Sequence, residues 1–237
     1  FTPKPAIAGD MGWLPIQMRQ HKNILQLWNR IVKLDADRLP VKILNIDMSS
    51  PGSWSHDIRQ IFADTGHLDS FVHVIPANID SIIDVKKQKY FQEWSNTCSN
   101  MPKLRTYCNF KPDFCIENYV KVILNRSKRS IYSQFRCGVL PIKIETGRYA
   151  GIPIGFRICE ICNLEEVEDE THFLFNCTAY DHERTDLMQI VLQHYSQIND
   201  YPDDAKLFIL LNDEDLTQPV ANFLHTAYLK RKFIMYS

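Results

Sequence analysis

Four metal-ligating side chains within nineteen consecutive positions constrain the fold of this chain more than any other feature of its sequence. Two residues separate Cys159 from Cys162, nine residues separate Cys162 from His172, and four residues separate His172 from Cys177. Two cysteines in a tight turn can grip one ion, and a nearby His and Cys can complete a tetrahedral site. Three thiolates and one imidazole are a closed set that leaves no position for a catalytic water. The sequence therefore predicts one structural Zn²⁺ ion.

The other ligand-type residues fit a metal site less well. The alternative, that the four residues are unrelated buried thiols and a core histidine, conflicts with their close spacing. His182 lies farther from Cys162 and is expected to be a solvated or core histidine. The spacing of the remaining cysteines forms no metal pair, so we expect small buried residues at Cys98, Cys108, Cys115 and Cys137. Seven cysteines, an odd number, favour a reduced, intracellular compartment.

The composition predicts a folded protein without a membrane span. The chain has 237 residues, 45% of them hydrophobic, which is enough to build a core. Its longest apolar run, 207–211, is far below the roughly 18 to 20 residues that cross a bilayer. The chain opens on Phe1 and shows no secretory signal pattern, so it is expected to be part of a longer chain.

Apolar periodicity predicts a mainly α fold with a small CCHC zinc knuckle inserted between helices. Apolar residues recur at helical spacing in segments 21–35, 53–62, 79–97, 116–136, 181–198 and 216–233. The strongest stripe is that of 116–136, in which Leu124 takes part, and Gly138 is expected to cap it. Segment 1–14, rich in Pro and Gly, predicts a loop anchored by an aromatic side chain. Alternating apolar residues at 140–145 predict an extended segment.

These patterns divide the chain into four expected regions. Residues 1–78 form an N-terminal linker and helical region, and residues 79–139 form a basic helical region. Residues 140–184 form the zinc-binding knuckle region, and residues 185–237 form a C-terminal helical tail.

Charge is segregated along the chain, although the net charge is only −1. Residues 86–157 carry 14 Lys and Arg against 4 Asp and Glu, whereas residues 158–217 carry 2 against 15. A basic stretch of this density attracts a phosphate backbone, with Tyr149 or Phe156 available to stack on bases. The alternatives are that the two stretches neutralise each other and that the basic helix face is only solvated. The candidate phosphate contacts are Lys121, Arg126, Lys128, Arg129, Arg136, Lys143, Arg148 and Arg157.

Several motifs resemble one protein family. They are Leu140-Pro-Ile-Lys-Ile-Glu-Thr-Gly-Arg148, Cys159-Glu-Ile-Cys162, Glu168-Asp-Glu170, His172-Phe-Leu-Phe175, and Cys177 with Tyr180 and Arg184. Together they resemble the zinc-binding C-terminal region of non-LTR retrotransposon reverse transcriptases. Phe1-Thr-Pro-Lys-Pro, Gly9-Asp-Met-Gly-Trp13 and Leu27-Trp-Asn-Arg30 resemble the linker that follows the polymerase core in such elements.

The resemblance covers nearly the whole chain and is most specific between Arg136 and Cys177. It implies a helical region whose zinc knuckle holds template RNA or target DNA close to the polymerase core of the same element. The resemblance alone implies a nuclear or cytoplasmic location. It does not imply chemistry, because polymerase catalysis needs carboxylates from separate strands around two metal ions.

No catalytic set is recognised in the sequence. Tyr201-Pro-Asp-Asp204 matches the Tyr-x-Asp-Asp pattern of polymerases, but it follows the zinc motif and its Pro would disturb a hairpin strand. We expect a turn that caps the next helix. No nucleophile motif and no phosphate-cradling Gly loop occur, so the chain is expected not to be an enzyme and to take no small-molecule substrate.

A second function of a different class competes with nucleic-acid binding. The acidic segment Glu165–Glu170 and the helical tail could instead dock onto the polymerase or another protein. The chain would then be a protein-interaction or scaffold module, and either function could belong to a truncated or domesticated copy of the element.

Overall fold

A computed structural model of the chain describes residues 3–123 and 125–236, without the side chain of Tyr236. The predicted mainly α fold is confirmed: the described residues form helices and no β-strand, with a single isolated bridge between Ile158 and Val167. Phe1 and Thr2 of the linker motif and Leu124 of the predicted stripe lie outside the described residues.

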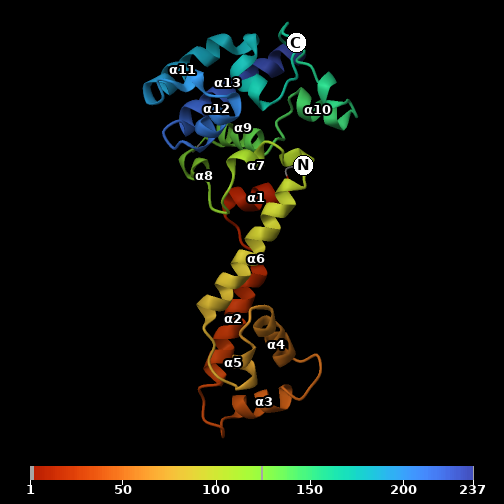
Figure 1. Cartoon of the computed structure of the whole chain (residues 1–237), viewed down its shortest axis with the longest axis vertical. Helices are drawn as coiled ribbons and strands as arrows, with labels where there is room; N and C mark the ends of the chain where they lie inside the picture. Colours follow the sequence, from red (N-terminus) through yellow and green to blue (C-terminus); the bar gives the residue numbers. More distant parts are fainter. Residues whose placement is uncertain (1–2, 124, 237) are drawn as a thin grey trace. The chain divides into compact units, whose positions relative to one another are not determined.

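The helices follow one another along the chain (Figure 1). The α-helices are α1 (Lys4–Met11), α2 (Ile16–Ile31), α3 (Leu39–Asp47), α4 (Trp54–Asp64), α5 (Leu68–Val72), α6 (Ile79–Ser99), α7 (Tyr107–Phe110), α8 (Asn118–Val122), α9 (Arg126–Arg136), α10 (Lys143–Tyr149), α11 (Asp181–His194), α12 (Asp203–Asn212) and α13 (Thr217–Tyr236). Short turns of other helix types are η1 (Pro102–Leu104), η2 (Ile154–Phe156), η3 (His172–Asn176), η4 (Thr178–Tyr180) and η5 (Ile198–Asp200).

The chain divides into two compact units. The larger unit contains Phe1–Trp13 and Ser95–Ser237, and the smaller unit contains Leu14–Trp94. The boundary at Trp94 falls inside α6, and the larger unit is discontinuous in sequence. This division follows packing, whereas the four expected regions follow sequence order and remain predictions.

The smaller unit is built around Trp28 of α2. Its ring stacks on Phe71 at a centroid distance of 5.5 Å and meets Phe62 edge-on at 5.6 Å, and its indole N–H donates to the Ile75 carbonyl at 3.0 Å. The neighbouring Asn29 exchanges two hydrogen bonds with the backbone of Ala77, at 2.7 and 2.8 Å. Trp28 and Asn29, which belong to the linker-like motif, therefore hold the core and the loop before α6.

The larger unit packs around α13, which lies against α9, α11 and α12 (Figure 1). An aromatic cluster joins α9, the short turns η3 and η4, and α13. Phe173 lies 6.1 Å from Phe135, 4.8 Å from Tyr180 and 6.3 Å from Phe223, measured between ring centroids. These apolar contacts fix the segment that carries His172 and Cys177.

The expectation of an N-terminal loop anchored by an aromatic is wrong. Residues Lys4–Met11 form α1, because a Pro in the first helical turn is preset for helix and its missing N–H costs nothing there. Gly12 ends the helix with φ 62°, and a Cβ there would lie 2.9 Å from the Ile116 backbone nitrogen. Trp13 is 60% exposed, whereas buried Asp10 accepts hydrogen bonds from Tyr107 and Tyr119 at 3.0 and 2.9 Å. A carboxylate, not the tryptophan, anchors this segment.

Two further expectations about elements need correction. The predicted helix 116–136 is interrupted, because Asn125 adopts extended backbone angles and its side chain accepts from the Lys128 N–H at 3.1 Å, capping a new helix, α9. Segment 140–145 is not extended: α10 begins at Lys143, whose N–H donates to the Glu168 carboxylate at 2.6 Å. The cap comes from a residue distant in sequence, so local alternation could not reveal it.

The other predicted helices are present with small shifts of their ends. Segments 21–35, 53–62, 79–97, 181–198 and 216–233 correspond to α2, α4, α6, α11 and α13. Gly138 follows α9 with φ 61°, and its N–H donates to the Phe135 carbonyl at 3.1 Å, as expected of a helix cap.

Candidate metal centre

The four predicted ligands lie together in the larger unit. One ligand atom from each of Cys159, Cys162, His172 and Cys177 lies within 4.8 Å of all the others. Cys159 and Cys177 have their sulfurs 3.9 Å apart, and the Cys162 sulfur is 3.4 Å from His172 Nε2. Cys159, His172 and Cys177 are buried. The four side chains could hold one metal ion.

The backbone around the ligands forms a tight loop, residues 157–177, which we call the metal loop. Its two arms pair, because the Cys159 N–H donates to the Glu166 carbonyl and the Glu168 N–H donates to the Arg157 carbonyl, both at 2.9 Å. Glu165 turns the chain with φ 54°. The π-helical turn η3 then brings His172 and Cys177 together, with the Cys177 N–H donating to the His172 carbonyl at 2.8 Å.

The imidazole of His172 is oriented for metal binding. Its Nδ1 lies 2.9 Å from the Glu166 carboxylate, while Nε2 faces the cysteines. A carboxylate partner of this kind fixes the tautomer with hydrogen on Nδ1 and leaves Nε2 free to coordinate. Within the protein alone, burial lowers the pKa of His172, but hydrogen bonds to Cys159 and Glu166 outweigh it and raise that pKa to about 9.

The thiols of the site differ in their affinity for a proton. The contact between the sulfurs of Cys159 and Cys177 lowers the pKa of Cys159 and raises the pKa of Cys177. Because metals bind the thiolate, Cys159 is prepared for an ion, whereas Cys177 must give up its proton.

Three alternate glutamates of the acidic segment contact different parts of the fold. Glu166 contacts His172. Glu168 is fully buried and accepts two hydrogen bonds from Arg231 of α13, at 2.8 and 2.7 Å. Glu170 is 3% exposed and is held by Arg105 at 3.1 and 2.8 Å. These carboxylates therefore make contacts inside the fold, and one of them, Glu170, pairs with a cation of the basic stretch 86–157.

One predicted phosphate contact is corrected by the structure. Arg136 is fully buried, and its guanidinium donates to the Leu211 carbonyl at 2.5 Å and lies 2.8 Å from the Glu117 carboxylate. The Asp10 carboxylate lies 3.7 Å from its Nε. These contacts lie inside the fold, so the guanidinium cannot reach a phosphate in solvent.

The predicted cations nearest the metal loop also make internal contacts. Arg157 donates to the carbonyls of Ile144 and Ile152, both at 2.8 Å, and its stem fills the space beside Gly147, where a Cβ would lie 2.8 Å away. Lys143 pairs with Glu160, and Arg148 pairs with Glu145 at 2.9 Å. Part of the family-like motif therefore holds α10 to the metal loop.

The predicted cations of α8 and α9 are more accessible. Lys121 and Arg126 are exposed. Lys128 and Arg129 are half-buried: Lys128 donates to Asn222 at 2.7 Å, and Arg129 donates to the Ile123 carbonyl at 3.0 Å. None of these four forms an ion pair with a carboxylate within the described ranges 3–123 and 125–236.

Exposed aromatics stand close to the metal loop. Tyr149 is 64% exposed and Phe156 is 74% exposed. The Arg148 guanidinium lies 4.3 Å from the centre of the Tyr149 ring and the Lys103 ammonium lies 5.6 Å from it. Lys103 was not among the predicted contacts, because it precedes the ring by 46 residues and only the fold reveals the neighbour.

The remaining sequence expectations have mixed outcomes. His182 is exposed and outside the ligand cluster. Cys98 and Cys137 are buried, but Cys108 is half-buried and Cys115 is exposed. Asp203 and Asp204 lie in the first turn of α12 after Pro202, as expected of a turn leading into a helix.

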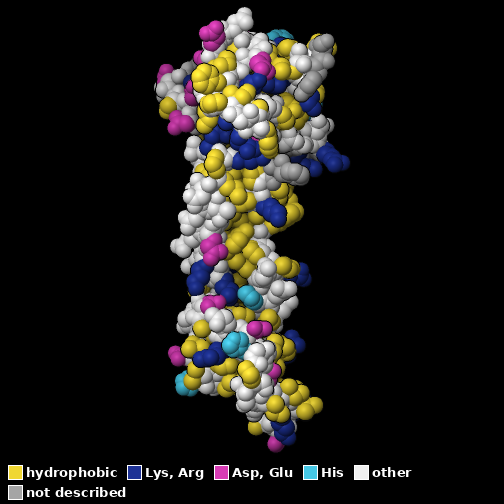
Figure 2. Space-filling view, turned by 90° about the vertical axis from the view of Figure 1, so that its right-hand side faces the viewer, with side chains coloured by type: hydrophobic (Ala, Val, Ile, Leu, Met, Phe, Trp, Pro, Cys, Tyr) yellow, Lys and Arg dark blue, Asp and Glu magenta, His cyan; other side chains and the backbone are white. Residues whose placement is uncertain are grey.

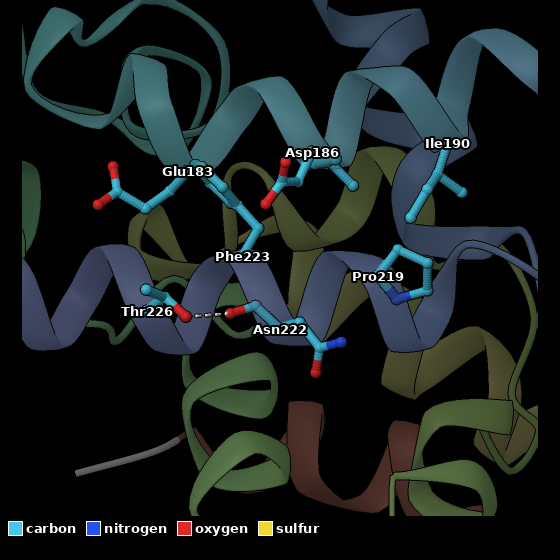
Figure 3. Close-up of a pocket in the computed structure, with 8 residues that line it drawn as sticks. Glu183, Asp186, Ile190, Pro219, Asn222, Phe223 and Thr226 are labelled. Carbon is cyan, nitrogen blue, oxygen red and sulfur yellow. Dashed lines mark hydrogen bonds between the residues drawn. The ribbon is translucent and has the colours of Figure 1, made fainter.

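A small pocket lies between α11 and α13, with a volume of about 210 Å³ (Figure 3). Glu183 and Asp186 face it from α11, and Asn222 and Thr226 face it from α13. The Glu183 carboxylate is already held by Lys230, at 3.0 Å to both oxygens. The lining offers no metal-ligand set, so the metal loop remains the candidate site.

The smaller unit carries basic and acidic residues in nearly equal numbers. Residues 14–94 include 10 Lys and Arg against 9 Asp and Glu. In the face shown in Figure 2, basic, acidic and histidine side chains are interspersed over this unit. The larger unit has 17 Lys and Arg against 19 Asp and Glu, so net charge does not distinguish the two units.

No protein-family model, no curated protein and no solved structure matches the chain. None of the described helices is both long enough and apolar enough to cross a membrane.

Proposed function

We propose that this chain is a non-catalytic, zinc-binding C-terminal region of a non-LTR retrotransposon reverse transcriptase, and that it binds template RNA or target DNA beside the polymerase core. The observation that carries the proposal is the cluster of three cysteines and one histidine in the metal loop. The family-like motifs of the sequence supply the context.

The geometry of the cluster supports zinc as the ion. Zn–S bonds of about 2.3 Å and Zn–N bonds of about 2.0 to 2.1 Å in a tetrahedron place two sulfurs about 3.8 Å apart and a sulfur and nitrogen about 3.6 Å apart. One sulfur pair here is 3.9 Å apart and one sulfur–nitrogen pair is 3.4 Å apart, and all four ligand atoms lie within 4.8 Å of one another. Thiolate-rich tetrahedral sets select zinc over the hard cations Mg²⁺ and Ca²⁺.

The same donor set supports a structural role for the ion. Four protein ligands complete the tetrahedron and leave no coordination position for water or substrate. The ion would join the two arms of the metal loop to η3, and through Glu168 it would stabilise the contact with α13. In this proposal the chain contributes nucleic-acid binding to the polymerase and takes no part in the chemical step.

The surface next to the metal loop supports nucleic acid as the partner. Tyr149 and Phe156 offer flat, exposed rings, and Arg148 and Lys103 place positive charge beside the Tyr149 ring. Exposed aromatics flanked by cations are typical of surfaces that stack bases and attract the backbone of single strands. The protein-docking alternative is less favoured, because Glu168 and Glu170 of its acidic segment are buried in ion pairs.

Retardation of single-stranded RNA and duplex DNA by the zinc-loaded chain tests this function. A stacked base contributes about 1 to 3 kcal/mol in alanine substitutions, so Phe156→Ala should weaken binding at least fivefold. Phe233 is equally exposed, at 74%, and lies in α13, so Phe233→Ala is the matched control and should change affinity less than twofold.

Two outcomes would count against the proposal. Absence of retardation of either nucleic acid at low salt by the zinc-loaded chain would remove nucleic-acid binding. Equal losses for Phe156→Ala and Phe233→Ala would remove the surface beside the metal loop as its location.

A further inference from the structure

A second basic feature of the larger unit is a pocket of about 490 Å³ between α8 and α9. Its lining includes Tyr119 from α8 and Arg126, Arg129, Ser130 and Ser133 from α9. Residues spaced by three, four and seven positions share one face of a helix, so two guanidiniums and two hydroxyls line one side of the pocket. It is separate from the metal ligands in sequence and in lining.

The lining of this pocket contains no carboxylate. Two carboxylates lie within two residues of the lining in sequence, buried Asp10 and half-buried Glu117, and they are engaged by Arg136 and Lys111. Arg126 and Arg129 therefore keep their full charge without a carboxylate partner in the part of the chain that the structure describes. An unbalanced pair of guanidiniums in a concave site attracts an anion.

Hydrogen-bond donors in the pocket are already oriented. One amino group of Arg129 donates to the Ile123 carbonyl at 3.0 Å, which fixes the guanidinium while its other N–H groups stay available. The Ser130 hydroxyl oxygen lies 3.2 Å from Gln134 Nε2 and accepts its hydrogen bond, so the hydroxyl hydrogen can be donated elsewhere. These donors suit the several oxygens of a phosphate group.

The first turn of α9 is unfavourable for helix stability by itself. It carries Arg126, Lys128 and Arg129 and no acidic residue. The amino-terminal end of a helix has partial positive charge, so cations there are repelled and an anion is attracted. A bound anion would relieve this repulsion, which is an argument from helix electrostatics independent of the pocket.

From these observations we propose that the pocket between α8 and α9 binds one phosphate group of a nucleic-acid backbone, with Arg126 and Arg129 sharing that group. The identity of the ligand rests on the proposed function, whereas the preference for a phosphate oxyanion rests on the pocket alone. Two binding points, here and beside Tyr149, would then lie on the same unit.

Side-chain NMR of the full chain tests the pocket directly. Inorganic phosphate and a single-stranded RNA oligonucleotide are added separately while the Nε–H signals of the arginines are followed. Both ligands should move the signals of Arg126 and Arg129. Arg157, whose Nε is bonded to the Ile152 carbonyl, is the internal control and should not respond to inorganic phosphate.

The salt dependence of RNA binding gives a second readout. Each phosphate neutralised on a single strand contributes about 0.7 to the slope of log affinity against log salt. Replacing both Arg126 and Arg129 with Gln should lower this slope by about that amount and not by twice as much, because both residues serve one phosphate. Arg19→Gln, the same change at an exposed position of α2, is the control and should leave the slope unchanged.

The outcomes separate this pocket from the proposed function. RNA binding with unmoved signals of Arg126 and Arg129 and an unchanged slope in the double variant would overturn the pocket and leave the proposed function standing. Arginine signals that respond to inorganic phosphate in a chain that binds no RNA would support the phosphate site and contradict the proposed function. Arginine signals that respond to neither ligand, in a chain that also binds no RNA, would overturn both.

Discussion

At the scale of single residues, Glu168 connects three segments of the larger unit. Its carboxylate accepts two hydrogen bonds from Arg231 of α13 and one from the Lys143 backbone at the start of α10. Its own backbone pairs with Arg157 and Ile144. The metal loop, α10 and α13 are therefore held by one buried side chain.

Replacing Glu168 should destabilise the fold strongly. Glu168→Gln leaves the Arg231 guanidinium, which is 7% exposed, without its counter-charge. Removing one partner of a buried ion pair costs about 3 to 5 kcal/mol. Denaturant unfolding of the zinc-loaded variant should show a loss in the free energy of unfolding of about that size.

Asp203→Asn is the matched control for this substitution. It makes the same carboxylate-to-amide change in a pair whose aspartate is 43% exposed, with Lys206 of the same helix. Exposed pairs of this kind contribute about 0 to 1 kcal/mol. Similar losses for the two variants would show that Glu168 does not hold the three segments.

The four metal ligands could be predicted as a set, but the fate of most cations could not. Ligand spacing is local, since a tight turn brings Cys159 and Cys162 together whatever surrounds them. Burial of Arg136 depends on Asp10 and Glu117, which lie in other segments and become its neighbours only in the fold. A basic residue on a helix does not reveal by itself whether it faces solvent.

At the scale of elements, the turn after α9 is set by a glycine. Gly138 has φ 61°, a backbone conformation that other residues rarely adopt. A Cβ at this position would also lie 2.6 Å from the Lys103 carbonyl oxygen, which is backbone and cannot easily move. The position thus requires glycine for two separate reasons.

Gly138→Ala should therefore lower the free energy of unfolding by more than the backbone strain alone. Gly151 has φ 71° but nothing within 4 Å of an added Cβ, so Gly151→Ala measures the strain of the left-handed backbone, about 1 to 2 kcal/mol. Unfolding measurements should give at least twice that loss for Gly138→Ala. Equal losses would mean that the approach of Lys103 relaxes without cost.

Helices with a continuous apolar stripe and local caps, such as α2, α6 and α13, could be predicted from the sequence. Failures occurred where caps or anchors come from elsewhere. The start of α10 depends on Glu168, and the anchoring of α1 depends on Tyr107 and Tyr119. The break before α9 was within reach of sequence reasoning, because Asn125 is a favoured N-cap residue followed by a polar run.

At the scale of the whole molecule, the segregated charge of the sequence is partly cancelled in the fold. Arg105 and Lys143 of the basic stretch pair with Glu170 and Glu160 of the acidic stretch. In the part of the chain that the structure describes, four cations of α8 and α9 have no carboxylate partner, namely Lys121, Arg126, Lys128 and Arg129, and those beside Tyr149 share Glu145. The proposed nucleic-acid binding depends on these remaining groups and not on the total charge.

The two units could not have been predicted from sequence order. The larger unit joins the first thirteen residues to the part beyond Trp94, because Asp10 is buried against α7 and α8. Such a closure depends on a contact between segments about a hundred residues apart in sequence, for which local patterns carry no signal.

Native mass spectrometry of the full chain, purified in the presence of zinc, tests the central claim most directly. The account predicts one zinc ion per wild-type chain, none in Cys177→Ala, and one in Cys115→Ala, whose exposed cysteine lies outside the cluster. A wild-type chain without zinc, or a Cys177→Ala chain that keeps its ion as well as Cys115→Ala does, would contradict the account.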